Sequence, residues 1–318
     1  MDLKKAETYP WLASARAQVK SAIERDRLPH AVLVHARPGL GGESLALWIA
    51  GVVLCEVQAA APCGECASCR LLAAGNHPDL AWVTRAEDAK SLQIEQVRTV
   101  CDVLALKSYR GGYKVAVIAT ADVMTPNAAN ALLKTLEEPP PQTLLILCAA
   151  RPSRLPATIV SRCQRIPVAT PPRAVALEWL QLQDQEAAWN DVLDFASGAP
   201  LRALELRANA FDDLHREMTQ ALAQLARREL DIPGVAERWS RNALETRLEW
   251  VETWVTNSIR KSLLEAADLQ TSGGIRKIRG LYGVLDRARG MRLELASSLN
   301  VQLAAEELLL RAEFALAA

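Results

Sequence analysis

Four cysteines stand close together in the sequence in an arrangement that could bind a metal ion. The chain has seven cysteines, and four of them follow the pattern C-x7-C-x2-C-x2-C: Cys55, Cys63, Cys66 and Cys69. Thiolates at this density, separated by glycine and small residues, are typical of a tetrahedral zinc site. An iron–sulfur cluster is the competing interpretation. Because four thiolates fill the coordination shell and leave no position for a reacting water, we expect a structural Zn2+.

One histidine and three further cysteines lie outside this pattern. His77 is near enough in the sequence to be a spare ligand, but four cysteines suffice, and we expect it to occupy a turn. The remaining cysteines are scattered along the chain and are expected to be small buried side chains: Cys101, Cys148 and Cys163.

A glycine-rich segment follows a short apolar run and precedes a helical pattern, which is the context of the phosphate-binding loop GxxxxGK(S/T). It contains Ala36, Gly39, Gly41, Gly42 and Glu43. If the motif ends at Glu43, Gly42 replaces the lysine and Ala36 the first glycine. If it ends at Ser44, Arg37 replaces the first glycine and Glu43 the lysine. Both registers lose the lysine, so we interpret the segment as a non-catalytic relic, with a plain glycine turn as the alternative.

The acidic residues of a working ATPase are also missing. Such enzymes end the second core strand with acidic side chains that hold Mg2+ and activate water. Here the apolar run 114–118 is followed by Ala119 and Thr120. The next acid, Asp122, is expected past the strand as the N-cap of a helix. We therefore expect no bound ATP and no hydrolysis by this chain alone.

The elements that must carry these residues alternate between helix-like and strand-like patterns. Such alternation predicts an α/β domain with a mostly parallel sheet. The expected helices are 11–25, 42–53, 92–104 and 128–138, and the expected strands are 31–35, 80–84, 114–119 and 143–148. After Pro172 the strand signals disappear and the composition is helical. The predicted domains are 1–170, with the cysteine insert at 55–69, then a small helical unit at 171–210 and a helical domain at 211–318.

Composition excludes several classes of protein. The 318 residues hold 37 Lys and Arg and 37 Asp and Glu, and this zero net charge disfavours a free-standing nucleic-acid binder. The first ten residues lack the apolar core of a signal peptide, and no apolar run approaches the roughly 20 residues of a membrane span. We therefore expect a cytoplasmic protein with no membrane partner, in which cysteines stay reduced.

Two further segments carry a resemblance to a known family. Residues 130–140, NALLKTLEEPP, followed by Ser161-Arg162-Cys163, resemble the clamp-loader AAA+ family of bacterial DNA polymerase III. The cysteine insert after the loop helix, the altered loop and the late segment 300–309 fit the same family, so the resemblance covers nearly the whole chain. Taken by itself, Arg162 would be interpreted as a member of a surface ion pair.

The resemblance implies a fold, a role and partners. The fold is an AAA+ P-loop NTPase-like sheet domain with a small helical lid and an all-α collar domain. Arg162 becomes an arginine finger that reaches ATP on a neighbouring motor subunit, and the four cysteines become zinc ligands. No ATP site is carried over, and Arg202, near the place of a lid arginine in motor subunits, is expected to be a surface charge. The implied partners are tau/gamma-type motor subunits and a delta-type subunit in a hetero-oligomeric ring, which contacts primed DNA and the sliding clamp.

The implied function is that of a non-hydrolysing structural subunit of the clamp loader, within a DNA-directed DNA polymerase holoenzyme. Two alternatives stay open. The first is an ATP-binding motor-type clamp-loader or helicase-loader subunit, against which the missing lysine and acids count. The second is a zinc-dependent DNA-binding module, against which the zero net charge counts.

Overall fold

The computed structural model describes residues 2–86, 89, 91–209, 211–264, 272–294 and 300–316. The chain divides into two compact units, Met1–Leu204 and Glu205–Ala318, which are treated separately. The predicted division into three domains, with boundaries near 170 and 210, stays a prediction, and residue 210 lies outside the described residues.

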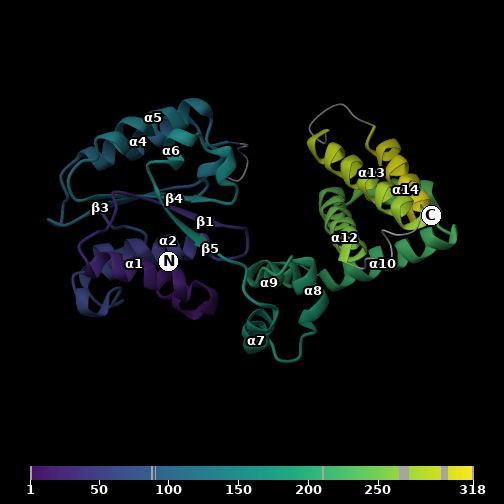
Figure 1. The fold of residues 1–318 in the computed structure, drawn as a ribbon, viewed down its shortest axis with the longest axis horizontal. Helices are drawn as coiled ribbons and strands as arrows, with labels where there is room; N and C mark the ends of the chain where they lie inside the picture. The colour runs from purple at the N-terminus through teal and green to yellow at the C-terminus, as the bar shows by residue number, and fades with distance from the viewer. Residues whose placement is uncertain are drawn as a thin grey trace. The chain divides into compact units, whose positions relative to one another are not determined.

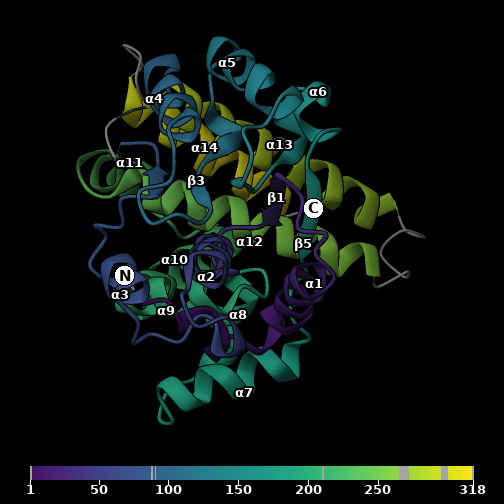
Figure 2. The same cartoon turned by 90° about the vertical axis from the view of Figure 1, so that its left-hand side faces the viewer.

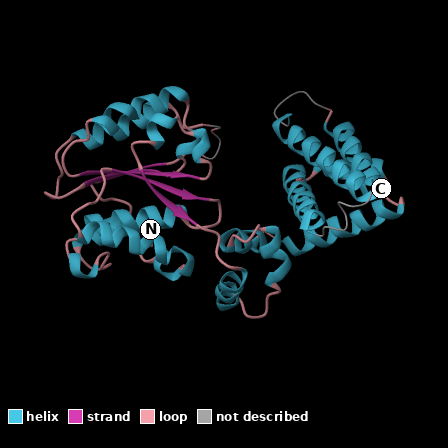
Figure 3. Cartoon of the chain, in the orientation of Figure 1, coloured by secondary structure: helices cyan, strands magenta, loops and turns pink. Residues whose placement is uncertain are grey.

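The first unit is built on one parallel sheet covered by helices on both faces (Figures 1 and 3). The strand order is β2-β3-β4-β1-β5, and each neighbouring pair is parallel. The strands are β1 (Ala31–Ala36), β2 (Leu80–Val83), β3 (Lys114–Ile118), β4 (Thr143–Ala149) and β5 (Gln164–Val168). The predicted α/β class with a parallel sheet is confirmed.

Two groups of helices cover this sheet (Figures 1 and 2). On one face lie α4 (Ile94–Ala105), α5 (Pro126–Glu137) and α6 (Ala157–Val160); on the other lie α1 (Ala13–Glu24) and α2 (Gly42–Leu54). Every residue of β3 and β4 is buried, because alternate side chains of these strands pack against opposite helical layers. The continuous apolar runs in the sequence therefore mark the central strands.

The edge strand β5 does not appear among the strands expected from the sequence. It pairs with β1 over residues 164–168, and its outward residues alternate with the buried Ile166 and Val168. Pro167 lies within it, and proline is tolerated in a sheet only where its position needs no ladder hydrogen bond, as at an edge. A short, half-exposed strand with a proline lacks the continuous apolar pattern that identifies its neighbours.

Helix α2 positions both the glycine-rich loop and the first of the four clustered cysteines. Nine of its thirteen residues are buried, and it packs against β1, β3 and β4. Its first residue, Gly42, ends the glycine-rich loop, and its last residue, Leu54, is followed directly by Cys55. The burial of one apolar helix thus fixes the loop at one end and the first cysteine at the other.

Several shorter helices and 3-10 turns complete the first unit. The remaining helices of the first unit are α3 (Ala67–Ala73), α7 (Arg173–Gln183) and α8 (Trp189–Phe195), followed by α9 (Pro200–Ala208). The 3-10 turns are η1 (Lys5–Thr8), η2 (Pro10–Leu12), η3 (Gln58–Ala60), η4 (Ala121–Val123) and η5 (Pro152–Arg154).

All the secondary-structure elements described in the second unit are helices. After the end of α9 they are α10 (Phe211–Arg227), α11 (Ile232–Arg241), α12 (Leu244–Leu264), α13 (Ser272–Glu294) and α14 (Val301–Leu316). Helix α13 packs against α12 and α14, and Trp250 is buried within the unit. The predicted helical C-terminal region is confirmed. None of the described helices combines the length and the apolar character that crossing a membrane requires.

Candidate functional site

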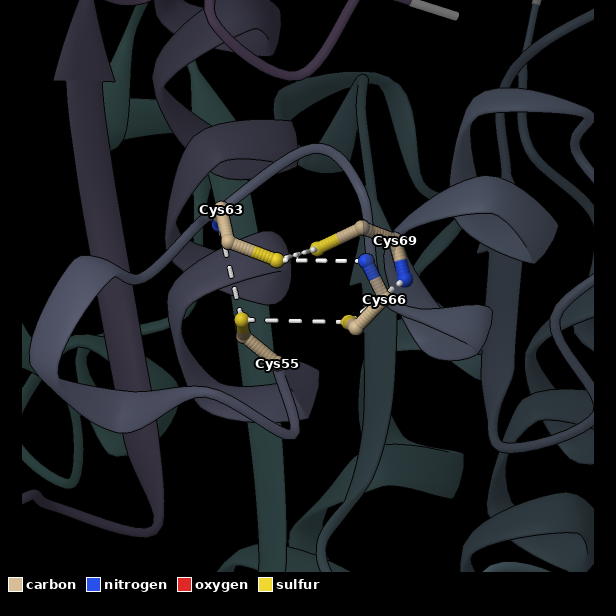
Figure 4. A group of neighbouring side chains, drawn as sticks. All are labelled: Cys55, Cys63, Cys66 and Cys69. Atoms are coloured by element: carbon tan, nitrogen blue, oxygen red, sulfur yellow. Dashed lines mark hydrogen bonds between the residues drawn. The ribbon is translucent and has the colours of Figure 1, made fainter.

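The four clustered cysteines converge on one point (Figure 4). Their Sγ atoms all lie within 4.8 Å of one another. Cys55 and Cys66 are 4.0 Å apart, and Cys63 and Cys69 are 3.8 Å apart. Four sulfurs bound tetrahedrally at about 2.3 Å from one ion are about 3.8 Å apart. The arrangement fits one tetrahedral metal ion, and the predicted grouping of these cysteines is confirmed.

A helix end, a turn and the start of a second helix assemble this cluster. Cys55 follows α2, and Cys66 is the N-cap of α3, where its Sγ accepts the N–H of Cys69. In the turn before α3, Gly64 has a φ of +83°, a conformation that glycine adopts freely. The N–H groups of Cys66 and Glu65 lie 3.3 and 3.4 Å from Sγ of Cys63 and lower its pKa to about 6. They favour the thiolate, which is the form that binds metals.

His77 is buried beside the cluster but is not part of it. Its Nδ1 accepts the N–H of Asp79 at 3.1 Å, so Nε2 carries the hydrogen and donates it to Ser68 Oγ at 2.7 Å. The Ser68 hydroxyl donates in turn to the carbonyl of Leu54 at 2.5 Å. Burial lowers the pKa of His77 and keeps the ring neutral. This chain of bonds ties α3 to the end of α2, a role for Ser68 that no local sequence pattern indicates.

Asp79 closes the loop that follows α4. It is almost fully buried, and it accepts the N–H groups of Tyr109 and Arg110 at 2.7 and 3.0 Å. The hydroxyl of Ser108 donates to it at 3.1 Å, and the ammonium of Lys114 lies 3.7 Å away. Burial by itself would raise the pKa of Asp79, but these donors outweigh burial, and the pKa lies below its usual value.

We expect Asp79→Asn to lower the free energy of unfolding by about 3 kcal/mol at pH 7, because it leaves the buried Lys114 unpaired. The lowered pKa means that the carboxylate contributes its full stability above about pH 4, the ordinary range of an aspartate. That contribution is lost as the pH falls through the folded pKa. Urea unfolding at pH 7 and pH 3 measures both effects. Asp102→Asn, at an exposed position, should change stability by less than about 0.5 kcal/mol; equal losses in the two variants would contradict the assignment.

The glycine-rich loop has the geometry of a phosphate loop without its side chains. It connects β1 to the first turn of α2, as the sequence predicts. A Cβ atom on Gly42, the position of the lysine in one register, would lie 2.7 Å from the Cβ of Ala36. That is closer than two carbon atoms approach, so a lysine cannot be accommodated at this position without movement of the loop.

Two other parts of the chain contact this loop. The carbonyl of Gly39 accepts the N–H of Leu201 at 3.1 Å, and the backbone of Arg202 lies directly against Gly39. The carbonyl of Leu40 accepts the indole N–H of Trp11 at 2.9 Å. The predicted role of Arg202 as a surface charge is therefore incomplete, because its backbone and Cβ pack on the loop.

An aromatic cluster lies next to the same loop. The ring of Tyr9 stacks on Trp11 at 5.2 Å between centroids, and Trp179 meets both rings edge-on. The Tyr9 ring would lie 3.0 Å from a Cβ atom on Gly41. The indole of Trp179 donates to the carbonyl of Thr8 at 2.8 Å, which joins α7 to the N-terminal segment.

Asp122 does not cap a helix, and that prediction is wrong. The chain leaves β3 through Ala119 and Thr120 and enters the 3-10 turn η4, in which Asp122 lies. Its carboxylate accepts the N–H of Arg151 at 3.0 Å, beyond the end of β4. The tight turn directs the side chain towards the loop that follows β4, so the carboxylate links the ends of β3 and β4.

Arg162 lies directly between α6 and β5. Its side chain is 35% exposed, and Nη2 forms an ion pair of 2.8 Å with Oε1 of Glu137, the last residue of α5. Nη1 donates to the carbonyl of Thr158 at 2.9 Å. The surface ion pair, which is the alternative to the finger role for this arginine, is present in the structure. The sequence does not identify Glu137 as its partner, although this glutamate belongs to the LLKTLEEPP segment.

The scattered cysteines lie apart from the metal cluster. Cys148 and Cys163 are buried, as predicted, whereas Cys101 is only half-buried. Burial raises the pKa of Cys163 to about 11, so its thiol stays protonated at neutral pH. Burial also raises the pKa values of Cys101 and Cys148, which disfavours the reactive thiolate form at all three positions.

Comparison with known proteins places the chain in one family. The family model described as "DNA polymerase III, delta subunit" matches residues 12–172. DNA polymerase III subunit delta' of Pseudomonas aeruginosa is 35% identical over 262 residues, covering 81% of this chain and 79% of the relative. That of Escherichia coli strain K12 is 30% identical over 318 residues, covering 96% and 95%. DNA polymerase III subunit tau/gamma of Haemophilus influenzae is 36% identical over 144 residues, 45% of this chain and 20% of that protein. The chain belongs to the DNA polymerase III delta' subunit family.

Proposed function

We propose that this chain is a non-hydrolysing subunit of the DNA polymerase III clamp loader. The observation that carries the proposal is the glycine-rich loop, which keeps the strand-turn-helix geometry but has no lysine in either register of the motif. In one register the lysine position is Gly42, which packs against Ala36, and in the other it is Glu43. The positions after β3 are Ala119 and Thr120, neither of which can hold Mg2+ as a carboxylate does. Family membership supports a role within the complex rather than as a separate enzyme.

The proposed contribution of this subunit to catalysis is Arg162. A guanidinium that reaches the γ-phosphate on a neighbouring subunit stabilises the negative charge of the transition state. Arg162 is suited to this role because it follows the short helix α6 and remains partly exposed. The subunit would thus complete an ATP site on a tau/gamma-type motor subunit, while its own loop stays without nucleotide.

The proposed cofactor is one structural zinc ion held by the four clustered cysteines. The contact distances between their sulfur atoms suit a single ion, whereas in an iron–sulfur cluster several irons stand between the thiolates. Zinc would hold the start of α3 against the end of α2. Reduced cysteines agree with the cytoplasmic location that we propose.

The proposed partners are motor subunits and a delta-type subunit in a hetero-oligomeric ring. Primed DNA and the sliding clamp would be contacted through that complex. Residues 171–210 would form the lid and residues 211–318 the collar that packs against other subunits. The described elements of both segments are helices, which agrees with a helical lid and a helical collar.

The proposal is tested by purifying the chain with and without tau/gamma-type motor subunits. The chain alone should neither bind a fluorescent ATP analogue nor hydrolyse ATP, because the loop lacks the lysine. Added to motor and delta-type subunits, it should co-purify and raise DNA-stimulated ATP turnover. Micromolar ATP binding by the isolated chain would favour a motor subunit instead, and salt-sensitive DNA binding by the isolated chain would favour a nucleic-acid binding module.

A further inference from the structure

If Arg162 is the arginine finger proposed above, the way in which its side chain is held affects catalysis. An arginine side chain has several rotatable bonds and loses about 2 kcal/mol of rotamer entropy when it is fixed. An arginine finger that must contact a phosphate on another subunit loses less of this entropy during the reaction if its side chain is already oriented before the subunits assemble. The structure shows two contacts that restrict Arg162, one from a carbonyl and one from a carboxylate.

We propose that Glu137 is the positioning residue for Arg162. The 2.8 Å bond from Nη2 of Arg162 to Oε1 of Glu137 joins positions that are 25 residues apart in the sequence. It is charge-assisted, and such bonds are about twice as strong as neutral ones. The carbonyl of Thr158 holds the other terminal nitrogen, so the plane of the guanidinium is defined from two sides.

Both anchors belong to elements that are fixed in the core. Helix α5 is held by Leu132 and Leu136, which are buried against the sheet, and Glu137 follows directly. Helix α6 is held by Ile159, which is fully buried and adjacent to Thr158. The guanidinium is therefore positioned relative to the sheet and not merely relative to its own loop.

The solvent exposure of the Arg162–Glu137 ion pair distinguishes a positioning role from a stabilising one. The side chains of Arg162 and Glu137 are 35% and 52% exposed, and exposed ion pairs add little to stability. The two described bonds use one N–H from each terminal nitrogen, whereas a guanidinium has five N–H donors in a planar fork. Donors thus remain for a phosphate while the carboxylate keeps its bond.

The test measures ATP turnover of the complex reconstituted with motor and delta-type subunits. Glu137→Gln keeps the shape of the side chain and removes its charge. We expect it to lower kcat of the site that Arg162 completes by about tenfold with KM unchanged, since misplaced catalytic groups lose transition-state stabilisation. The matched control is Glu138→Gln, which changes the adjacent exposed glutamate and should leave kcat unchanged.

A double variant shows whether Glu137 acts through Arg162. In the Arg162→Ala background, Glu137→Gln should have no further effect, because there is no guanidinium left to orient. An equal loss in both backgrounds would overturn the inference, as would full activity of Glu137→Gln beside a defective Arg162→Ala. If Arg162→Ala itself is fully active, the proposed function fails, which separates that failure from the failure of the positioning role. Gel filtration of each complex checks that assembly is unchanged.

Discussion

Replacing Arg162 by alanine is expected to slow ATP turnover on the order of a thousandfold at the site that this chain is proposed to complete, which is within the range known for arginine fingers. In the proposed role, the change removes a positive charge that meets the γ-phosphate only in the transition state, so kcat should fall more than KM rises. Any ATP site that this chain does not complete should keep its rate. Arg162→Lys should recover part of the rate, since a lysine supplies the charge without the planar fork of donors.

The measurement is DNA-stimulated ATP turnover and clamp loading by the reconstituted complex. Arg165→Ala is the matched control, because Arg165 is an exposed arginine three residues further along and lies in β5. It should leave both rates close to those of the wild type. Unchanged rates for Arg162→Ala, in a complex that assembles normally, would exclude the finger role.

Replacing Cys69 by serine is expected to abolish zinc binding and to unfold the segment from Cys55 to the end of α3. Cys69 is fully buried, and its Sγ lies 3.8 Å from that of Cys63. Structural zinc contributes about 10–16 kcal/mol of binding free energy in isolated zinc-finger peptides, and this energy stabilises the fold that presents the ligands. A buried serine hydroxyl cannot replace a thiolate as a zinc ligand.

Metal analysis and limited proteolysis measure this effect. The wild-type chain should carry about one zinc per molecule and resist cleavage within the segment. Cys69→Ser should carry almost none and be cut there, whereas the control Cys101→Ser, outside the cluster, should keep its zinc. Iron in the wild-type protein, or an undiminished zinc content in Cys69→Ser, would contradict the assignment.

The predictability of the fold follows from how each strand is buried. Strands β3 and β4 are covered on both faces, so their sequences are apolar without interruption and can be identified from sequence alone. Strand β5 lies at the edge, where solvent and a proline are tolerated, and its sequence therefore resembles a loop. The four helices that the sequence predicts in the first unit lie close to α1, α2, α4 and α5, because each of these carries an apolar face or, in α2, is apolar almost throughout.

Features of the candidate sites could likewise be predicted where they depend on one short chain segment, and not where they depend on contacts between distant segments. The cysteine cluster could be predicted because its four cysteines lie within fifteen positions of one chain segment, where spacing alone limits the geometry. The altered phosphate loop could be predicted for the same reason. The orientation of the Asp122 side chain could not be predicted, because it depends on the 3-10 turn after β3 and on the backbone N–H of Arg151 in a different loop.

The sequence by itself determined which side chains are present: the four clustered cysteines, the loop without a lysine, and Arg162 shortly after α6. Only the tertiary structure decided how those groups are held. Glu137 contacts Arg162 because α5 and α6 pack on the same face of the sheet. The N–H of Leu201 in α9, far from Gly39 in the sequence, donates to the carbonyl of Gly39. Contacts of this kind depend on the packing of whole elements in the core, and no spacing within a short segment encodes them.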